Sequence, residues 1–255
     1  MVDLDKVRVA GLGDLHCGRI PANSLEPLFV QIAHDADILV LCGDLTDHGL
    51  PEEAIALTKV LTGSLKIATV AVLGNHDYHT GHVAEIEKIL KDAGITVLDG
   101  EACEIHGVGF AGVKGFIGGF GRRTLEPWGE DLVKQVVNEA VNETLKLGSA
   151  LAKLRTKHRV AVLHYAPIAE TVQGEPPEIW PYLGCSRLAE PLSRFQVTLA
   201  FHGHAHHGQA EGRYQEIPVY NVSLPLMQRD HPERPYRVIE LAGTPGPEPV
   251  IGHAR

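Results

Sequence analysis

The sequence predicts an α/β fold in which a largely parallel sheet carries helices on its outside. Strand-like apolar runs alternate with helical patterns through roughly the first hundred of the 255 residues. Some of these runs are apolar throughout, as expected for strands that are covered on both faces. Polar residues follow the strands directly, and right-handed crossovers would bring these polar ends to one edge of the sheet.

Composition limits the kinds of function that the chain can have. Apolar residues make up 44% and aromatic residues 5%, so the core must consist mainly of Val, Ile, Leu and Ala. The formal net charge of -9 disfavours a general nucleic-acid binder, which would normally present a basic face. The four cysteines show no CxxC spacing, which excludes a zinc finger or a disulfide framework.

The chain carries no targeting or membrane pattern that we recognise. Its first residues lack the basic and then apolar order of a signal peptide, and no apolar stretch approaches the roughly 20 residues of a membrane span. We therefore expect a cytoplasmic protein. Without an internal repeat or linker, we predict a single domain over 1–255, in which 243–255 form a loose tail or a packed extended end.

The first predicted strand, 7–12, leads into Asp14 and His16. In an extended chain two residues that are two apart point the same way, so both side chains could reach one ion. The alternative is a solvated turn aspartate beside an incidental histidine.

Two further strands of this half also end in polar side chains. The apolar run 38–42 leads into Gly43 and Asp44, with Asp47 close behind, and the run 67–73 leads into 75–77, which read Asn-His-Asp. In open α/β sheets, ligands bind beyond the carboxyl ends of strands. Helical patterns lie between these runs, at 24–36, 51–61 and 83–93.

The rhythm changes after residue 95, where short strands at 96–98, 103–105 and 108–112 follow one another without helices. The glycine-rich stretch 115–123 comes next, and it lacks the spacing of a dinucleotide or phosphate-binding loop. It is either a flexible surface connection or a loop over the active site. In the second case its substrate contacts would be drawn from Phe116, Phe120, Arg122 and Arg123.

The second half contains one long amphipathic helix and two strands that end in histidine. The helix, 130–155, keeps an apolar stripe that suits a covering helix. The strand 160–163 ends at His164. The proline-rich segment 166–184 follows, and it is either a lid or a packed surface loop in which Trp180 and Tyr182 could stack a base beside Phe116 and Phe120.

A strand at 197–201 leads into His202, Gly203 and His204. His206 and His207 come just after, and we expect them to be bystanders or to support the ligands from behind. The last predicted strands are 219–222 and 237–241.

Seven polar residues thus follow apolar strands and could bind metal: Asp14, His16, Asp44, Asn75, His164, His202 and His204. Oxygen and imidazole ligands without thiolate suit Mn²⁺, Fe or Zn²⁺. Seven ligands are more than one ion needs, whereas two ions could use them all if they shared the Asp44 carboxylate. Two divalent ions would outweigh the charges of Asp14 and Asp44 and leave about two positive charges, which favours a phosphate substrate.

These motifs, in this order along the chain, resemble those of the calcineurin-like metallophosphoesterases. The resemblance implies a four-layer α/β/β/α sandwich of two mixed sheets flanked by helices. It implies one metal held by Asp14, His16, Asp44 and His204. It implies a second metal held by Asp44, Asn75, His164 and His202. His76 would contact the phosphate and assist the leaving group without binding metal.

Two residues near His76 refine this expectation. Asp47 matches the second aspartate of the family's Gly-Asp-x-x-Asp pattern, which orients the histidine. Many phosphoprotein phosphatases of the family then have arginine, where this chain has His48. The pattern is closer to the family's small prokaryotic-type phosphodiesterases and phosphatases. On chemical grounds a carboxylate beside His76 would favour its charged form, and both Asp47 and Asp77 are candidates for that partner.

The predicted function is therefore a dinuclear metal-dependent phosphoesterase. A metal-bridging hydroxide would attack the phosphorus of a phosphodiester or phosphomonoester while His76 assists the departing oxygen. We expect a small substrate such as a nucleotide rather than a long nucleic acid, and the pattern leaves the oligomeric state open. The alternatives are a non-catalytic metal-binding scaffold on the same fold and a dinuclear hydrolase that cleaves a non-phosphate bond.

Overall fold

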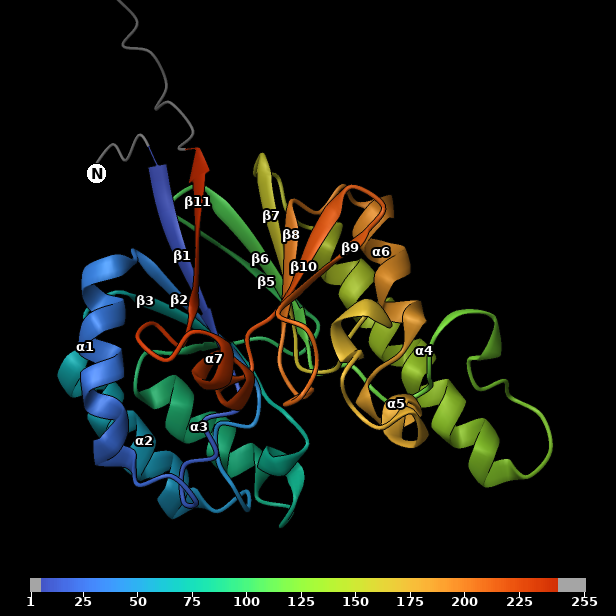
Figure 1. The fold of residues 1–255 in the computed structure, drawn as a ribbon, viewed down its shortest axis with the longest axis horizontal. Helices are drawn as coiled ribbons and strands as arrows, with labels where there is room; N and C mark the ends of the chain where they lie inside the picture. Colours follow the sequence, from blue (N-terminus) through green and yellow to red (C-terminus); the bar gives the residue numbers. More distant parts are fainter. Residues whose placement is uncertain (1–5, 243–255) are drawn as a thin grey trace, which may run out of the picture.

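Two β-sheets pack face to face at the centre of the computed structural model, which describes residues 6–242 (Figure 1). Helices α1 to α3 lie on the outer side of the first sheet, and α4 and α6 lie on the outer side of the second. The predicted four-layer α/β/β/α sandwich is therefore confirmed. The predicted tail at 243–255 lies outside the described residues.

The first sheet contains the early strands of the chain, in the order β11-β1-β2-β3-β4. Only β11 runs antiparallel to its neighbour. Its strands are β1 (Lys6–Leu12), β2 (Ile38–Cys42), β3 (Ala68–Val72), β4 (Thr96–Val97) and β11 (Arg237–Ala242). The crossovers are α1 (Glu26–Asp35), α2 (Pro51–Ser64) and α3 (Val83–Asp92). Proline at the first position of α2 suits a helix start, because its missing N–H has no partner to lose there.

The second sheet has the order β5-β6-β7-β8-β10-β9, with antiparallel strands at both edges. Its strands are β5 (Glu101–Ile105), β6 (Val108–Val113), β7 (His158–Leu163), β8 (Leu199–His202), β9 (Glu211–Tyr214) and β10 (Ile217–Asn221). The remaining helices are α4 (Asp131–Leu151), α5 (Trp180–Leu183), α6 (Glu190–Arg194) and α7 (Leu224–Asp230).

The alternation of side chains along a strand divides the apolar residues between the layers. In β2, Val40 faces the second sheet, where it joins a cluster with Phe110 and Phe201, whereas Leu39 and Leu41 face the helices. A strand that is buried on both faces must be apolar at every position, which is why this run reads as continuously hydrophobic. None of the helices in residues 6–242 is both long and apolar enough to cross a membrane.

Most predicted elements match the observed ones to within a few residues. The exceptions are irregular or short. The sequence pattern did not predict β9, α6, α7 or the short helical turns within 166–184. β9 is an edge strand whose residues Glu-Gly-Arg-Tyr carry no apolar alternation, and α7 has only seven residues. Helix α4 ends at Leu151 rather than at residue 155, because the chain turns there and lets Leu154 pack beneath the helix.

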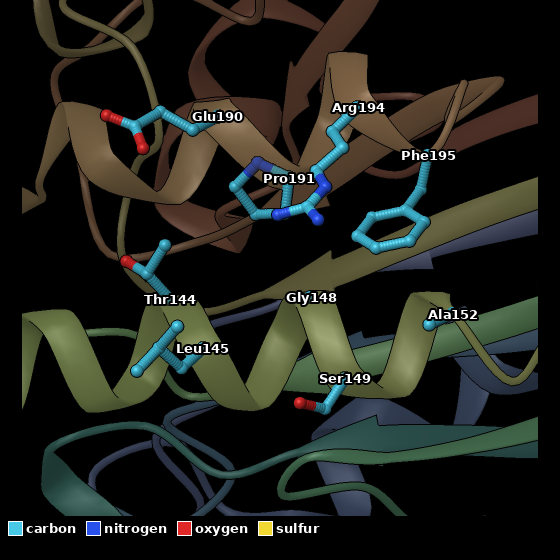
Figure 2. A pocket seen from close by; sticks show the side chains of 9 residues that line it. All are labelled: Thr144, Leu145, Gly148, Ser149, Ala152, Glu190, Pro191, Arg194 and Phe195. Atoms are coloured by element: carbon cyan, nitrogen blue, oxygen red, sulfur yellow. The ribbon is translucent and has the colours of Figure 1, made fainter.

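A hollow of about 340 Å³ separates α4 from α6 on the outer side of the second sheet (Figure 2). Gly148 leaves room on the helix side, and Pro191, Arg194 and Phe195 form the opposite wall. The hollow is lined by none of the residues that the sequence analysis assigned to metal or catalysis.

Candidate metal centre

The loops that follow β1, β2, β7 and β8 run side by side at the carboxyl ends of their strands. Backbone hydrogen bonds tie them together. The Asp14 amide donates to the Gly43 carbonyl at 2.9 Å, and the Gly203 amide donates to the His164 carbonyl at 3.2 Å. Side chains from distant parts of the sequence therefore converge at this edge, as the α/β topology requires.

Three groups of metal-type donors lie at this edge, and one of them joins His16 to Asp47 and His76. Of the two groups that meet at Asp44, the first contains Asp14, His16 and His206, and the second contains Asp44, His164 and His204. Within each group the donor atoms lie within 4.8 Å of one another. Asp44 faces both groups, since its Oδ2 is 3.9 Å from His16 Nε2 and its Oδ1 is 3.4 Å from His164 Nε2. One carboxylate is thus placed to serve two cations.

Asn75 completes the second group. Its Oδ1 lies 2.9 Å from His164 Nε2. His164 Nδ1 lies 2.9 Å from the Cys42 carbonyl, to which it donates when the hydrogen is on that nitrogen. In this tautomer the lone pair of Nε2 faces the oxygen of Asn75. Two lone pairs that face each other at this distance suit a cation that both could bind.

The electrostatics of the cluster also fit cations. Burial and the charges of Asp14 and Asp77 raise the pKa of Asp44 well above its usual range. Burial acts in the same direction on Asp14, but the hydrogen bond from His206 and the nearby His164 hold the pKa of Asp14 well below its usual range. Carboxylates that are buried together repel one another, and a bound cation removes that penalty.

Three of the histidines are set up to be neutral, as metal ligands must be, whereas the neighbouring Asp14 raises the pKa of His206. Burial lowers the pKa of His16 to about 4. Burial also lowers the pKa values of His164 and His204 from 6.5. Lone pairs on these rings are therefore available at neutral pH.

Several ligand candidates have strained backbones. Asp14, His16, Asp44 and His204 have positive φ angles of 58°, 42°, 49° and 71°, which L-residues rarely adopt. Such strain concentrates at functional sites, where the surrounding structure enforces it. Two glycines allow the crowding, because a Cβ on Gly74 would overlap Asp44 Oδ1 and a Cβ on Gly203 would overlap Asp14 Oδ2.

The structure does not bring His202 to either group. It is the last residue of β8, it is fully buried, and both ring nitrogens face protein. His202 Nδ1 lies 2.8 Å from the Gly203 carbonyl, and Nε2 lies 2.8 Å from Thr171 Oγ1. This arrangement argues against the predicted role of His202 as a ligand, since no lone pair is left for a cation.

His206 was expected to be a bystander or a supporting residue, but it lies in the first group, where the sequence analysis had placed His204. His204 lies in the second group instead. His206 Nε2 lies 3.0 Å from Asp14 Oδ1 and 3.5 Å from His16 Nε2. The chain leaves β8 through the left-handed residue His204, so residues 204 and 206 turn toward the centre together. The two-residue spacing that paired Asp14 with His16 fits His202 and His204 as well as His204 and His206, so it could not have separated the two pairs.

His76 lies edge-on to His16, with ring centroids 4.5 Å apart. Its Nδ1 donates to the backbone carbonyl of Asp47 at 2.6 Å and lies 3.8 Å from the Asp47 carboxylate. The side chain is one-third exposed, which leaves Nε2 available to a bound molecule. Asp47 is therefore the neighbour that orients His76, mainly through its main chain.

Asp77 has a different role from the one that the sequence allowed. It is fully buried, and its carboxylate accepts hydrogen bonds from the amides of Leu45, Thr46 and Gly74 and from the Thr46 hydroxyl. The three bonds from Leu45 and Thr46 fasten the loop after β2 to the loop after β3, and the bond from Gly74 holds the second loop in its turn. Asp77 therefore positions Asp44 and Asn75 rather than acting on His76.

The segments 115–123 and 166–184 form one packed wall beside the centre. Gly118 donates to the Pro181 carbonyl and Gly119 to the Gly184 carbonyl, both at 2.8 Å. Phe120 and Trp180 pack against a small apolar cluster in this wall, and Trp180 Nε1 donates to the Glu175 carbonyl at 3.0 Å. Of the two readings of 166–184, a packed surface segment fits these contacts.

The other residues that we predicted to touch substrate lie at different places around the centre. Tyr182 is exposed, and its carbonyl lies 3.2 Å from His204 Nε2. Arg122 and Arg123 are exposed on the short turn η3 (Gly121–Arg123). Phe116 lies beside Tyr165, with ring centroids 6.2 Å apart. Their contact with substrate stays a prediction.

Comparison with protein families gives a match over most of the chain. A family profile described as calcineurin-like phosphoesterase matches residues 7–208. A bovine (Bos taurus) protein named transmembrane protein with metallophosphoesterase domain is 23% identical over 217 residues, covering 81% of this chain and 41% of the relative. An uncharacterized metallophosphoesterase of Aquifex aeolicus (strain VF5) is 27% identical over 103 residues, covering 40% of this chain and 39% of the relative. The chain thus matches about two fifths of the length of each relative.

Solved structures share the fold. The phosphopantetheinyl hydrolase PptH from Mycobacterium tuberculosis has a TM-score of 0.66 at 14% identity, covering 92% of this chain and 96% of that one. The protein TT1561 of Thermus thermophilus has a TM-score of 0.55 at 15% identity, covering 92% of this chain and 98% of that one. At these identities the likeness concerns the arrangement of strands and helices.

Proposed function

Because this chain belongs to the calcineurin-like phosphoesterase family, we propose that it is a metal-dependent phosphoesterase in which the donors around Asp44 hold a pair of divalent cations. The observation that carries the proposal is the position of Asp44, buried between two groups of donors with one oxygen toward each. A shared carboxylate is the usual means of holding two metals about 3.5–4 Å apart.

The proposed ligand set differs from the sequence-based one in two histidine positions. His206 replaces His204 at the first cation, and His204 replaces His202 at the second. The first cation would be held by Asp14, His16, Asp44 and His206. The second would be held by Asp44, Asn75, His164 and His204. Imidazole and oxygen donors without thiolate favour Mn, Fe or Zn. When bound, the cations would supply Lewis acidity, which activates water and neutralises the charge of the phosphoryl group.

The chain's own residues would complete the reaction. His76 holds its Nδ1 hydrogen on the Asp47 carbonyl, so in the protonated ring Nε2 carries a hydrogen that points away from that contact. A general acid must lie within hydrogen-bond reach of the leaving oxygen, and a half-buried histidine beside His16 meets this need. Asp77 would keep both ligand loops in register through its four hydrogen bonds.

The proposed substrate is a small phosphoester, with a phosphodiester preferred over a phosphoprotein. His48 supports this preference, because it occupies the position at which many protein phosphatases of the family have arginine, and its Nδ1 is occupied by contacts of 3.3 Å with Asp47 and Glu53. The net charge of -9 argues against long nucleic acids.

The test combines metal analysis with turnover. Protein loaded with Mn²⁺, Fe²⁺ or Zn²⁺ is expected to retain up to two ions per chain after gel filtration and to hydrolyse bis-p-nitrophenyl phosphate faster than p-nitrophenyl phosphate. The control is the Asp44→Asn variant treated in the same way. Stoichiometric metal without turnover of either ester would instead favour a metal-binding scaffold.

A further inference from the structure

Lys114 lies beside the candidate metal centre, in a position that the reaction described above does not use. It directly follows β6, and its backbone carbonyl accepts hydrogen bonds from the amides of His164 and Tyr165 at 3.1 and 3.0 Å. These bonds fix the start of the Lys114 side chain next to the end of β7, which supplies the proposed ligand His164.

Three aromatic rings surround the Lys114 ammonium. Its Nζ lies 4.8 Å from the ring centroid of Phe116, 5.3 Å from that of Tyr165 and 5.4 Å from that of Tyr78. The three rings come from separate loops, and their faces stabilise a cation without neutralising it. Nζ also donates to the Gly115 carbonyl at 2.9 Å. An ammonium has three donors, so this contact leaves two unused.

Two other cations of the chain, Arg19 and Lys146, are paired with carboxylates, whereas Lys114 is not. Arg19 lies 2.9 Å from the Asp47 carboxylate, and Lys146 lies 2.7 Å from that of Glu143. Within residues 6–242 no carboxylate oxygen lies within 4.0 Å of Lys114 Nζ. Glu143 is already satisfied, because its second oxygen accepts from the Gly115 amide at 2.7 Å. Lys114 is therefore not needed as the counter-ion of Glu143.

Tyr165 links this cage to the metal centre. Its ring centroid lies 4.6 Å from that of His204 and 5.4 Å from that of His164. The ammonium therefore lies on the flank of the second donor group, about one aromatic ring away from its ligands. His76 contacts the first donor group instead. A phosphoryl group between the cations would be neutralised by them, so the Lys114 charge is placed for a group further along the substrate.

We propose that Lys114 binds a second anionic group of the substrate, one that is not hydrolysed, and so selects phosphoesters that carry such a group. The proposal rests on the proposed function, because it assumes that the scissile phosphate occupies the cation pair. A partly desolvated ammonium with unused donors gains more from a phosphate or carboxylate than an exposed lysine does.

The experiment compares two ligands that differ in one phosphate. Binding of thymidine 3′,5′-bisphosphate and thymidine 5′-monophosphate to the Mn²⁺-loaded protein is measured by isothermal titration calorimetry. We expect the bisphosphate to bind about tenfold more tightly, as one charge-assisted contact can provide. Lys114→Met and Lys114→Gln should remove this difference, and Lys114→Arg should keep most of it.

Lys146→Met is the matched control, since it removes a nearby lysine that is paired with Glu143 and lies outside the cage. It should keep the tenfold difference. The proposal is overturned if the wild type binds both ligands equally, if the Lys114 variants keep the difference, or if they weaken both ligands alike.

A parallel assay separates this outcome from the fate of the proposed function. The p-nitrophenyl esters of the two nucleotides are offered to the wild type. Failure to hydrolyse either ester would count against the phosphoesterase proposal, while the ratio of the two binding constants would still decide the role of Lys114.

Discussion

The two sheets contribute to the candidate centre in different ways. The first sheet delivers Asp14, Asp44 and Asn75 through short turns that a single buried carboxylate, Asp77, helps to fasten. The second sheet delivers its histidines next to a long irregular segment, 166–184, which holds His202 through Thr171. One half of the site is thus fixed locally, and the other depends on contacts with a distant loop.

Replacing Asp44, which both halves share, should have the largest effect. Asp44→Asn removes the charge that faces both donor groups, so we expect both metals to be lost and turnover to fall by about 10³-fold or more. Metal content by mass spectrometry and kcat on bis-p-nitrophenyl phosphate measure this. Retention of two ions by the variant would contradict the central position of Asp44.

Two histidines that follow or end β8, His206 and His202, offer a matched pair of variants for testing the ligand set. His206→Asn should lower the metal content by one ion per chain and reduce kcat about 100-fold, because it removes a donor that faces Asp14. His202→Asn should keep its metal, since both nitrogens of His202 already face protein. The two variants are compared as folded, gel-filtered protein, and the reverse order of metal loss would restore the sequence-based ligand set.

Asp77→Asn tests whether the first half is fixed locally. An amide cannot accept all four hydrogen bonds and presents its own donors to amide hydrogens, so we expect a loss of about 2–3 kcal/mol in the free energy of unfolding. Activity should fall about tenfold, in kcat more than in KM, as the ligand loops shift. Urea unfolding and steady-state kinetics measure the two effects. If the variant kept its stability and only its pH profile changed, Asp77 would instead be the carboxylate that favours the charged form of His76.

Acidification of the metal-free protein should give the smallest effect. His16 and His202 have pKa values of about 4 in the folded state, below the ordinary 6.5. The unfolded chain therefore binds more protons between these values, and stability falls as the pH drops through this window. The lowered pKa values of His164 and His204 add to this loss. The raised pKa values of His206, Asp44 and Asp77 offset part of it.

We expect the thermal midpoint of chelator-treated protein to be about 5 °C lower at about pH 5 than at about pH 7. Differential scanning calorimetry measures it, and reloading with metal should diminish the difference. A midpoint that rises on acidification would mean that these histidines are more accessible to protons than their burial indicates.

The contrast between the two halves also explains which site residues could be predicted from the sequence. Asp14, Asp44 and Asn75 follow buried strands after a few residues at most, so periodicity alone located them. The choice between His202 and His206 depended on the left-handed turn at His204, which no periodicity encodes. Lys114 and Tyr165 were missed because neither belongs to a motif, and only the packing of their loops brings them to His204. The fold was more predictable because apolar alternation specifies layers directly.

The chemical difference between the two donor groups has a consequence for how the centre fills. Asp14 gives the first group a carboxylate of its own, where the second group has the neutral amide of Asn75. The first position therefore carries more negative charge and should bind its ion first. The first ion neutralises part of the negative charge of Asp44, so the second ion is attracted less strongly. We expect metal to bind in two steps, so that a species with one ion per chain accumulates during the titration. The second position of this species could then bind a different metal.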